Sequence, residues 1–112
     1  MKIINKTKNT VIAEEYICAD SLLKRLKGLL GTKALKTGQA LILDPCNSIH
    51  TFFMKYPIDV IFVNRDNKVV KIITSIPPFR LTGIYFSASY AIELPANTIK
   101  PTEISLGDSL LL

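Results

Sequence analysis

One stretch of the sequence limits the possible folds more than any other: two apolar runs separated by four polar residues. The first run is Ile58 to Val63, the second is Lys68 to Ile73, and Asn64-Arg65-Asp66-Asn67 lies between them. β-branched side chains favour extended backbone, whereas asparagine and aspartate accept the dihedral angles of turns. The stretch therefore predicts a β-hairpin, and the rest of the fold has to accommodate it.

Shorter segments on both sides of the hairpin continue the β pattern. Five further strands are predicted, at residues 2–4, 10–18, 40–43, 90–94 and 109–112. Residues 5–9 form a polar turn between the first two. Pro45 and Pro95 follow two of the others, and proline cannot donate a hydrogen bond to a β-ladder.

One helix is predicted near the start of the chain. Asp20 is suited to cap its first turn and Gly31 to end it. Between them leucines recur at spacings of three and four, the period of an amphipathic helix. These leucines are Leu22, Leu23, Leu26, Leu29 and Leu30. The predicted fold class is thus α+β and mostly β: a compact antiparallel sheet or barrel-like domain with one short helix near the N-terminus.

Length and composition favour one domain over residues 1–112. The chain is 48% hydrophobic, yet no apolar stretch approaches the roughly 18 residues that cross a bilayer. The first ten residues lack an apolar leader segment, which predicts a cytoplasmic protein. Cys18 and Cys46 lack the spacing of a redox motif, so in a reducing compartment both are expected to be buried thiols.

The net charge of +5 raises the question of an anionic partner. Most of the fourteen lysines and arginines are scattered along the chain, which is typical of a solvated surface. Lys24, Arg25 and Lys27 form a denser group on the predicted helix. A basic module that binds nucleic acid or an anionic surface therefore stays an alternative, although no motif of a nucleic-acid-binding fold supports it.

Residues 46–62 hold the chain's only histidine, His50, with Cys46, Ser48 and Asp59 in an apolar context. A buried polar group without a partner costs about 1–3 kcal/mol, so these residues either bond one another or perform chemistry. A nucleophilic Cys46 or Ser48 with His50 as its base is one hypothesis. On a strand, however, residues four apart are separated by about 13 Å, which disfavours contact between Cys46 and His50.

The carboxylates have a structural interpretation. Asp59 and Glu93 each stand between apolar residues of a predicted strand, so we expect them to accept backbone N–H groups or to pair with Arg25 or His50. Asp108 follows Gly107 in a predicted turn and is expected to bond the backbone that follows it. These acids lack the short spacing of a metal site, and no metal or cofactor is predicted.

Several segments carry a family resemblance. They are Arg25 with Gly28-Leu29-Leu30-Gly31, Ser48-Ile49-His50-Thr51 with Met54 and residues 57–62, Ile92-Glu93-Leu94-Pro95-Ala96, and Gly107-Asp108. Taken in this order, over roughly residues 11–112, the chain resembles the DUF192 family of small bacterial and archaeal domains. The resemblance implies a compact, mostly β fold with a small helix. It implies no established activity, because the family has none to transfer.

The expected function is therefore non-catalytic binding of a small molecule, a glycan or a protein partner. The surface expected to bind is formed by Ser48, His50, Met54 and Asp59, with Arg25 and Glu93 beside it. Aromatic residues support this hypothesis, because Phe52, Phe53 and Tyr56 cannot all point inward along one strand. Residues 77–80 and 85–86 form a second segment that is rich in aromatic side chains. Phe62 is the aromatic residue expected in the core.

Overall fold

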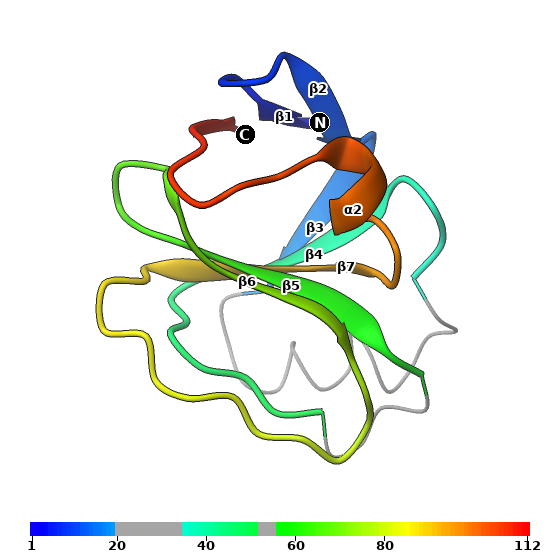
Figure 1. Ribbon diagram of the computed structural model, residues 1–112, viewed down its shortest axis with the longest axis vertical. Coiled ribbons are helices and arrows are strands. Elements are labelled where there is room, and N and C mark those ends of the chain that lie inside the picture. The colour runs from blue at the N-terminus through cyan, green and yellow to red at the C-terminus, as the bar shows by residue number, and fades with distance from the viewer. Residues whose placement is uncertain (20–34, 52–55) are drawn as a thin grey trace.

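The computed structural model describes residues 1–19, 35–51 and 56–112 (Figure 1). In these ranges the chain forms strands and one short helix, α2. The elements are β1 (Ile3–Asn5), β2 (Thr10–Ala13), β3 (Glu15–Ala19), β4 (Gln39–Leu43), β5 (Ile58–Val63), β6 (Val69–Ile76), β7 (Tyr90–Pro95), α2 (Ile99–Thr102) and β8 (Leu110–Leu111).

The strands form two sheets. The small sheet has the order β2-β1-β8 and contains the first and the last strand of the chain. The large sheet has the order β3-β4-β7-β5-β6. Figure 1 shows the small sheet above one face of the large sheet, whereas the connections between β4 and β5 and between β6 and β7 extend below the other face.

The predicted hairpin is confirmed. β5 pairs with β6 on one side and with β7 on the other, and all six of its residues are buried. Phe62 is fully buried, as expected of a core residue. β6 extends to Ile76, three residues beyond the predicted end, and it stops where Pro77 begins. The most regular sequence pattern therefore lies at the centre of the large sheet.

Each face of the large sheet carries its own apolar core, because side chains alternate along a strand. Ile61 points toward the small sheet and shares a cluster with Ile3 of β1. Its neighbours Val60 and Phe62 point the other way and share a second cluster with Ile49, which lies in the connection after β4. The large sheet thus separates a core between the two sheets from a core under the loops.

Two predictions about strand pairing are wrong. The large sheet is mixed rather than antiparallel, since β3 and β4 run parallel. The single strand predicted over residues 10–18 is two strands that belong to different sheets. The chain leaves the small sheet at Glu14, where the N–H groups of Glu14 and Glu15 both donate to the carbonyl oxygen of Gly38, over 2.8 and 3.1 Å. This contact is distant in sequence, which is why local propensity does not reveal it.

The helix that the structure describes lies near the C-terminus, in a segment predicted to be a polar connection. The helix predicted from residue 21 lies outside the described residues. α2 is short and has no acidic residue in its first turn. It forms because a side chain from β5 accepts its first N–H groups, as described below. In the described part of the chain, no helix has the length and apolar character needed to cross a lipid bilayer.

No disulfide joins the two cysteines, and only one of them is buried. Cys46 lies in the core under the loops. Cys18 is exposed, which contradicts the expectation that both thiols would be buried. The reason is its position on β3, the edge strand of the large sheet, where the neighbouring Ile17 is also exposed.

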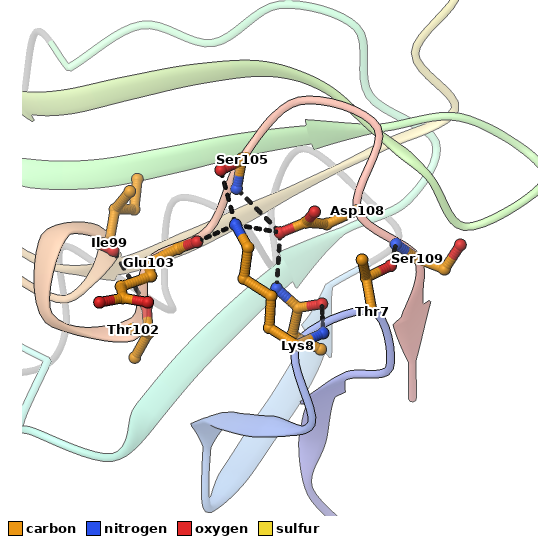
Figure 2. A network of polar contacts seen from close by, with 9 residues as sticks. Thr7, Lys8, Ile99, Thr102, Glu103, Ser105, Asp108 and Ser109 are labelled. Atoms are coloured by element: carbon orange, nitrogen blue, oxygen red, sulfur yellow. Dashed lines mark hydrogen bonds and ion pairs between the residues drawn. The ribbon is translucent and has the colours of Figure 1, made fainter.

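Asp108 lies in a turn, as predicted, but its carboxylate bonds residues before it rather than after it. Oδ2 accepts the N–H of Ser105 over 2.9 Å and the Asn5 amide over 2.8 Å. Lys8 Nζ lies 3.1 Å from the same oxygen (Figure 2). Burial opposes ionisation of Asp108, but the bonds from Asn5, Ser105 and Lys8 outweigh it, so the pKa of this carboxyl lies below its ordinary value. The ionised carboxylate joins the last turn of the chain to the β1–β2 turn.

Replacement of the Asp108 carboxylate should change how the free energy of unfolding depends on pH. Because its pKa is lowered in the folded state, the ionised group stabilises the fold above the unfolded pKa of about 3.9, and this contribution is lost as pH falls through the folded pKa. Asp108→Asn is expected to lower the free energy of unfolding by about 1–3 kcal/mol at pH 7. Urea unfolding between pH 7 and pH 3 should show the difference from wild type shrinking below about pH 4.

The control is Asp66→Asn, in the exposed turn between β5 and β6. It should change the free energy of unfolding by less than about 0.5 kcal/mol at every pH. A difference between wild type and Asp108→Asn that stays constant down to pH 3 would contradict the assigned role of the carboxylate.

Candidate functional site

Asp59 was predicted to accept backbone N–H groups, and it does. The side chain is 1% exposed. Its Oδ1 accepts the N–H of Ser75 over 2.8 Å, and its Oδ2 accepts the N–H groups of Thr98 and Ile99, both over 2.9 Å. A buried carboxylate is tolerated when hydrogen bonds satisfy its oxygens. Asp59 therefore joins β5 to β6 and to the start of α2.

The bond to Ser75 lies at an irregularity in the sheet. The register between β5 and β6 shifts from Ile58 opposite Ile76 to Val60 opposite Ile73, so β6 has one extra residue there. Ser75 has a φ of 50°, a left-handed value that non-glycine residues seldom adopt. An extra residue in a bulge leaves the β-ladder locally unpaired, and Asp59 supplies the missing acceptor.

The predicted site residues divide between the two faces of the large sheet. Asp59 alternates with Val60 and therefore lies on the face toward the small sheet. Glu93 is paired directly across from Val60 and lies with it on the face toward the loops, where Cys46 also packs. Glu93 is 2% exposed. The structure thus does not bring Asp59 together with Cys46 or Glu93. Arg25 and Met54 lie outside the described residues.

Tyr56 lies close to Glu93 on the loop side. Burial raises the pKa of the Tyr56 phenol, the charge of Glu93 raises it further, and the backbone of Leu35 opposes the change. The phenol is therefore protonated at neutral pH. This part of the loop side combines a buried acid with a neutral hydroxyl group.

The candidate nucleophiles have different surroundings from the candidate base. The Cys46 thiol is buried and donates a hydrogen bond to the carbonyl oxygen of Ser48 over 3.0 Å. Buried cysteines of this kind pack as part of the structure, whereas reactive cysteines are partly exposed. His50 is exposed and forms an isolated β-bridge with Leu81. The described geometry therefore gives more support to a structural role for Cys46 than to catalysis.

His50 belongs to a pair of segments that we name the loop pair, residues 47–51 and 77–86. The two segments run side by side without forming a regular sheet. Backbone hydrogen bonds of 2.8–3.0 Å join them: Thr51 N–H to Arg80 O, Phe79 N–H to Thr51 O, Thr82 N–H to Ile49 O and Tyr85 N–H to Asn47 O. The loop pair therefore has a fixed backbone arrangement.

Two buried threonines hold the loop pair in a reciprocal manner. Thr51 Oγ1 donates to Pro77 O over 2.7 Å and accepts the N–H of Arg80 over 2.9 Å. Thr82 Oγ1 accepts the N–H of Ile49 over 2.9 Å. Each hydroxyl thus bonds the backbone of the opposite segment, and because both residues are buried, these bonds are shielded from water.

One aromatic residue fixes the loop pair to the sheet. The ring of Tyr85 lies 4.7 Å from that of Phe62, centroid to centroid, at an interplanar angle of 50°. This tilted arrangement is favourable for aromatic pairs. Lys71 Nζ lies 5.8 Å from the centroid of Tyr85, within the range of a cation–π contact. The loop pair is therefore part of the packed structure.

The outer side chains of the loop pair form what we name the apolar face. Phe79 is 70% exposed, Leu81 68%, Ile84 57% and Phe86 87%. Sequence reasoning found the aromatic members of this face and missed Leu81 and Ile84. A signal was present, since apolar residues recur between Pro78 and Ala88 in a segment with no strand alternation. Large exposed apolar side chains concentrated in one short segment indicate an interaction site.

Within residues 1–19, 35–51 and 56–112, no three side chains of His, Cys, Asp or Glu gather closely enough to hold a metal ion. The carboxylates of Asp59 and Asp108 instead accept hydrogen bonds within the fold.

The two-sheet architecture recurs in a solved structure. A protein of unknown function from Novosphingobium aromaticivorans DSM 12444 superposes with a TM-score of 0.83, covering 100% of this chain and 84% of its own. The two sequences are 18% identical. At this identity the likeness shows a shared fold and nothing about activity. It defines the protein as a small β domain with two stacked sheets.

Sequence comparison gives the family. The family model of DUF192, described as Uncharacterized ACR, matches residues 3–112. A UPF0127 protein of Thermococcus sibiricus is 34% identical over 112 residues, which cover 96% of this chain and 72% of the relative. A UPF0127 protein of Pyrococcus horikoshii is 35% identical over 111 residues, 96% of each chain. The chain belongs to the DUF192 family, which confirms the resemblance noted in the sequence.

Removal of a threonine hydroxyl should loosen the loop pair. Thr82→Val keeps the side-chain shape but leaves the buried N–H of Ile49 without its acceptor, at a cost of about 1–3 kcal/mol. Urea unfolding should show this loss, and hydrogen exchange should be faster at Ile49 than in wild type. Thr37→Val, at an exposed turn, is the matched control. Equal stability of the two variants would show that the Thr82 hydroxyl does not hold the segments.

Replacement of Asp59 by asparagine, which has the same shape but no charge, should lower the stability of the fold. Asp59→Asn replaces one of two acceptor oxygens with an N–H₂ group, so at least one backbone N–H of Ser75, Thr98 or Ile99 loses its partner. We expect a loss of about 2–3 kcal/mol in the free energy of unfolding and faster hydrogen exchange at the start of α2. Asp66→Asn again serves as the control. A loss of stability with unchanged exchange at Ser75 and Ile99 would contradict the assigned bonds.

Proposed function

We propose that this chain is a one-domain, non-catalytic interaction module that binds another protein through the apolar face. One observation carries the proposal: four large apolar side chains between residues 79 and 86, each 57–87% exposed, lie on a loop pair whose backbone is held by hydrogen bonds. Apolar and aromatic anchors of this size supply most of the binding energy at protein interfaces.

Rigidity strengthens this interpretation. Ordering a flexible loop on binding costs free energy, and a loop that is already ordered avoids that cost. Thr51 and Thr82 order the loop pair from inside, so the exposed side chains are not needed to hold it. An exposed apolar surface on a preorganised backbone is suited to recognition.

Charge supports a different protein as the partner over a second copy. Residues 46–51 and 77–89 contain Arg80 and His50 and no acidic residue. A two-fold dimer through this face would join two surfaces of the same positive charge with no acidic residue between them, which is unfavourable. An apolar pocket with an acidic rim would instead complement the face.

This proposal modifies the surface expected from the sequence. It retains Ser48 and His50, which belong to the first segment of the loop pair. Asp59 and Glu93 are not included, because both are buried and bear on the stability of the sheet. Binding by Arg25 and Met54 stays a prediction, and so does a cytoplasmic location.

The two alternative functions, a thiol-dependent enzyme and a module that binds an anionic partner, can each be tested separately. Rapid alkylation of Cys46 by iodoacetamide at neutral pH would favour a thiol-dependent enzyme, because the thiolate is the reactive form. Salt-sensitive retention on heparin would favour a module that binds nucleic acid or an anionic surface. The described contacts of Cys46 give the enzyme hypothesis no support beyond the original pattern.

The test is site-specific photo-crosslinking followed by quantitative binding. A benzoyl-phenylalanine at position 86 should crosslink one protein in extracts of the host, whereas the same probe at position 106 should not. Leu106 is a matched control, since it is 65% exposed and lies outside the apolar face. The purified partner should then bind the wild-type chain, with Phe79→Ser and Phe86→Ser each weakening binding by about tenfold or more.

Other outcomes would overturn the proposal. Equal crosslinking from positions 86 and 106, or an affinity that Phe79→Ser and Phe86→Ser leave unchanged, would exclude the apolar face. A dimer in sedimentation experiments that Phe86→Ser dissociates would identify a second copy as the occupant. Binding to lipid vesicles that depends on Phe86 would identify a membrane instead.

A further inference from the structure

A second surface has the properties of a binding site. An open cleft of about 550 Å³ lies between the end of β6, the connection into α2, the segment after α2 and the β1–β2 turn. Its lining includes Lys8, Asp59, Ser75, Asn97, Lys100 and Glu103. No residue of the loop pair lines it. The cleft and the apolar face are therefore separate surfaces, and its volume is in the range of small-molecule sites.

Two charged groups fix the walls of this cleft. Asp59 bonds Ser75 on the β6 side and Thr98 and Ile99 on the α2 side, and so joins two walls. Lys8 bonds the third wall, as Figure 2 shows: Nζ donates to the carbonyl oxygen of Glu103 and to Ser105 Oγ and pairs with Asp108. The shape of the cleft is thus set by contacts within the fold.

Backbone strain is concentrated at the same place. Ser75, Asn97 and Glu103 have φ values of 50°, 69° and 56°. They are three of the six non-glycine residues with positive φ in the described part of the chain, and all three line the cleft. A left-handed conformation costs about 1–2 kcal/mol at such residues, and strain of this kind is characteristic of functional sites.

Several polar side chains of the cleft are available to a ligand. None of the side chains of Thr74, Ser75, Asn97, Lys100 and Glu103 forms a hydrogen bond or ion pair within the described residues, and all five are exposed. Ile99 and Ile104 also line the cleft, but both belong to the core and are only 4% and 7% exposed. The cleft therefore offers an ammonium, a carboxylate, an amide and two hydroxyls beside a small apolar area.

The balance of charge indicates the class of ligand. Lys8 is paired with Asp108. Asp59 keeps its charge, but it is buried and its oxygens accept backbone N–H groups, so it is not accessible to a ligand. The exposed charged side chains of the lining that form no ion pair within the described residues are Lys100 and Glu103, one of each sign. A ligand with a net charge would be attracted by one and repelled by the other. A zwitterion can form charge-assisted bonds with both, whereas a neutral polyol gains nothing from the two charges.

We propose that this cleft binds a small zwitterion of the amino-acid or dipeptide class. The ligand carboxylate lies at Lys100, its ammonium lies at Glu103, and its apolar stem contacts Ile99 and Ile104. Asn97 and the hydroxyls of Thr74 and Ser75 bond the remaining polar atoms. The site is independent of the apolar face, so either surface can function if the other proposal fails.

Nuclear magnetic resonance titration of the full chain tests this proposal. Glycyl-leucine should produce saturable shifts at the backbone amides of Ser75, Asn97 and Glu103. N-acetyl-glycyl-leucinamide, which has the same stem without terminal charges, should bind about tenfold more weakly or not at all. Lys100→Met and Glu103→Gln should each weaken binding of glycyl-leucine by a similar factor. Lys68→Met, an exposed lysine outside the cleft, should leave it unchanged.

The opposite results would overturn the proposal. These are the absence of saturable shifts with glycyl-leucine, glycyl-lysine and free leucine up to about 20 mM, or shifts confined to residues outside the cleft. Binding of the blocked dipeptide as tightly as the free one would show that the charges are not recognised. Saturable binding of maltose in the cleft without binding of dipeptides would identify a polyol site instead.

Discussion

The buried carboxylate of Asp59 is the interaction on which most of the structure depends. A charge at 1% exposure is stable only when it is fully bonded, and three backbone N–H groups bond this one. Those groups belong to an irregular strand and to a helix too short to stabilise itself. One side chain thereby determines where β6 bends and where α2 begins. The walls of the cleft follow from the same bonds.

Asp108 has an equivalent role for the small sheet. It joins Asn5 at the end of β1 to the turn before β8, and Lys8 neutralises it. The small sheet has short strands that bury little on their own, so polar bonds between its turns matter more than they would in a larger sheet. Asp59 thus holds the large sheet and α2 together, whereas Asp108 connects the N-terminal and C-terminal parts of the chain.

Elements of the fold that depend on local sequence pattern can be predicted from the sequence. Ile58 to Val63 and Tyr90 to Leu94 are long apolar runs bounded by turn residues, and their strands are confirmed. The break at Glu14 and the start of α2 depend on Gly38 and Asp59, which are distant in sequence. Strand alternation predicts from the sequence that Asp59 and Val60 point to opposite faces of the sheet. It does not predict the face on which Glu93 lies, because that depends on how β5 pairs with β7. Exposure of Cys18 depends likewise on which strand lies at the edge.

The loop pair divides its residues into those that hold the backbone and those that face solvent. The side chains of Thr51, Thr82 and Tyr85 perform the first role, whereas the side chains of Phe79, Leu81, Ile84 and Phe86 are exposed. Natural selection can therefore act on the two sets separately. Relatives that keep the threonines can exchange the outward side chains and so acquire new specificities by drift and selection, while the scaffold itself is inherited unchanged.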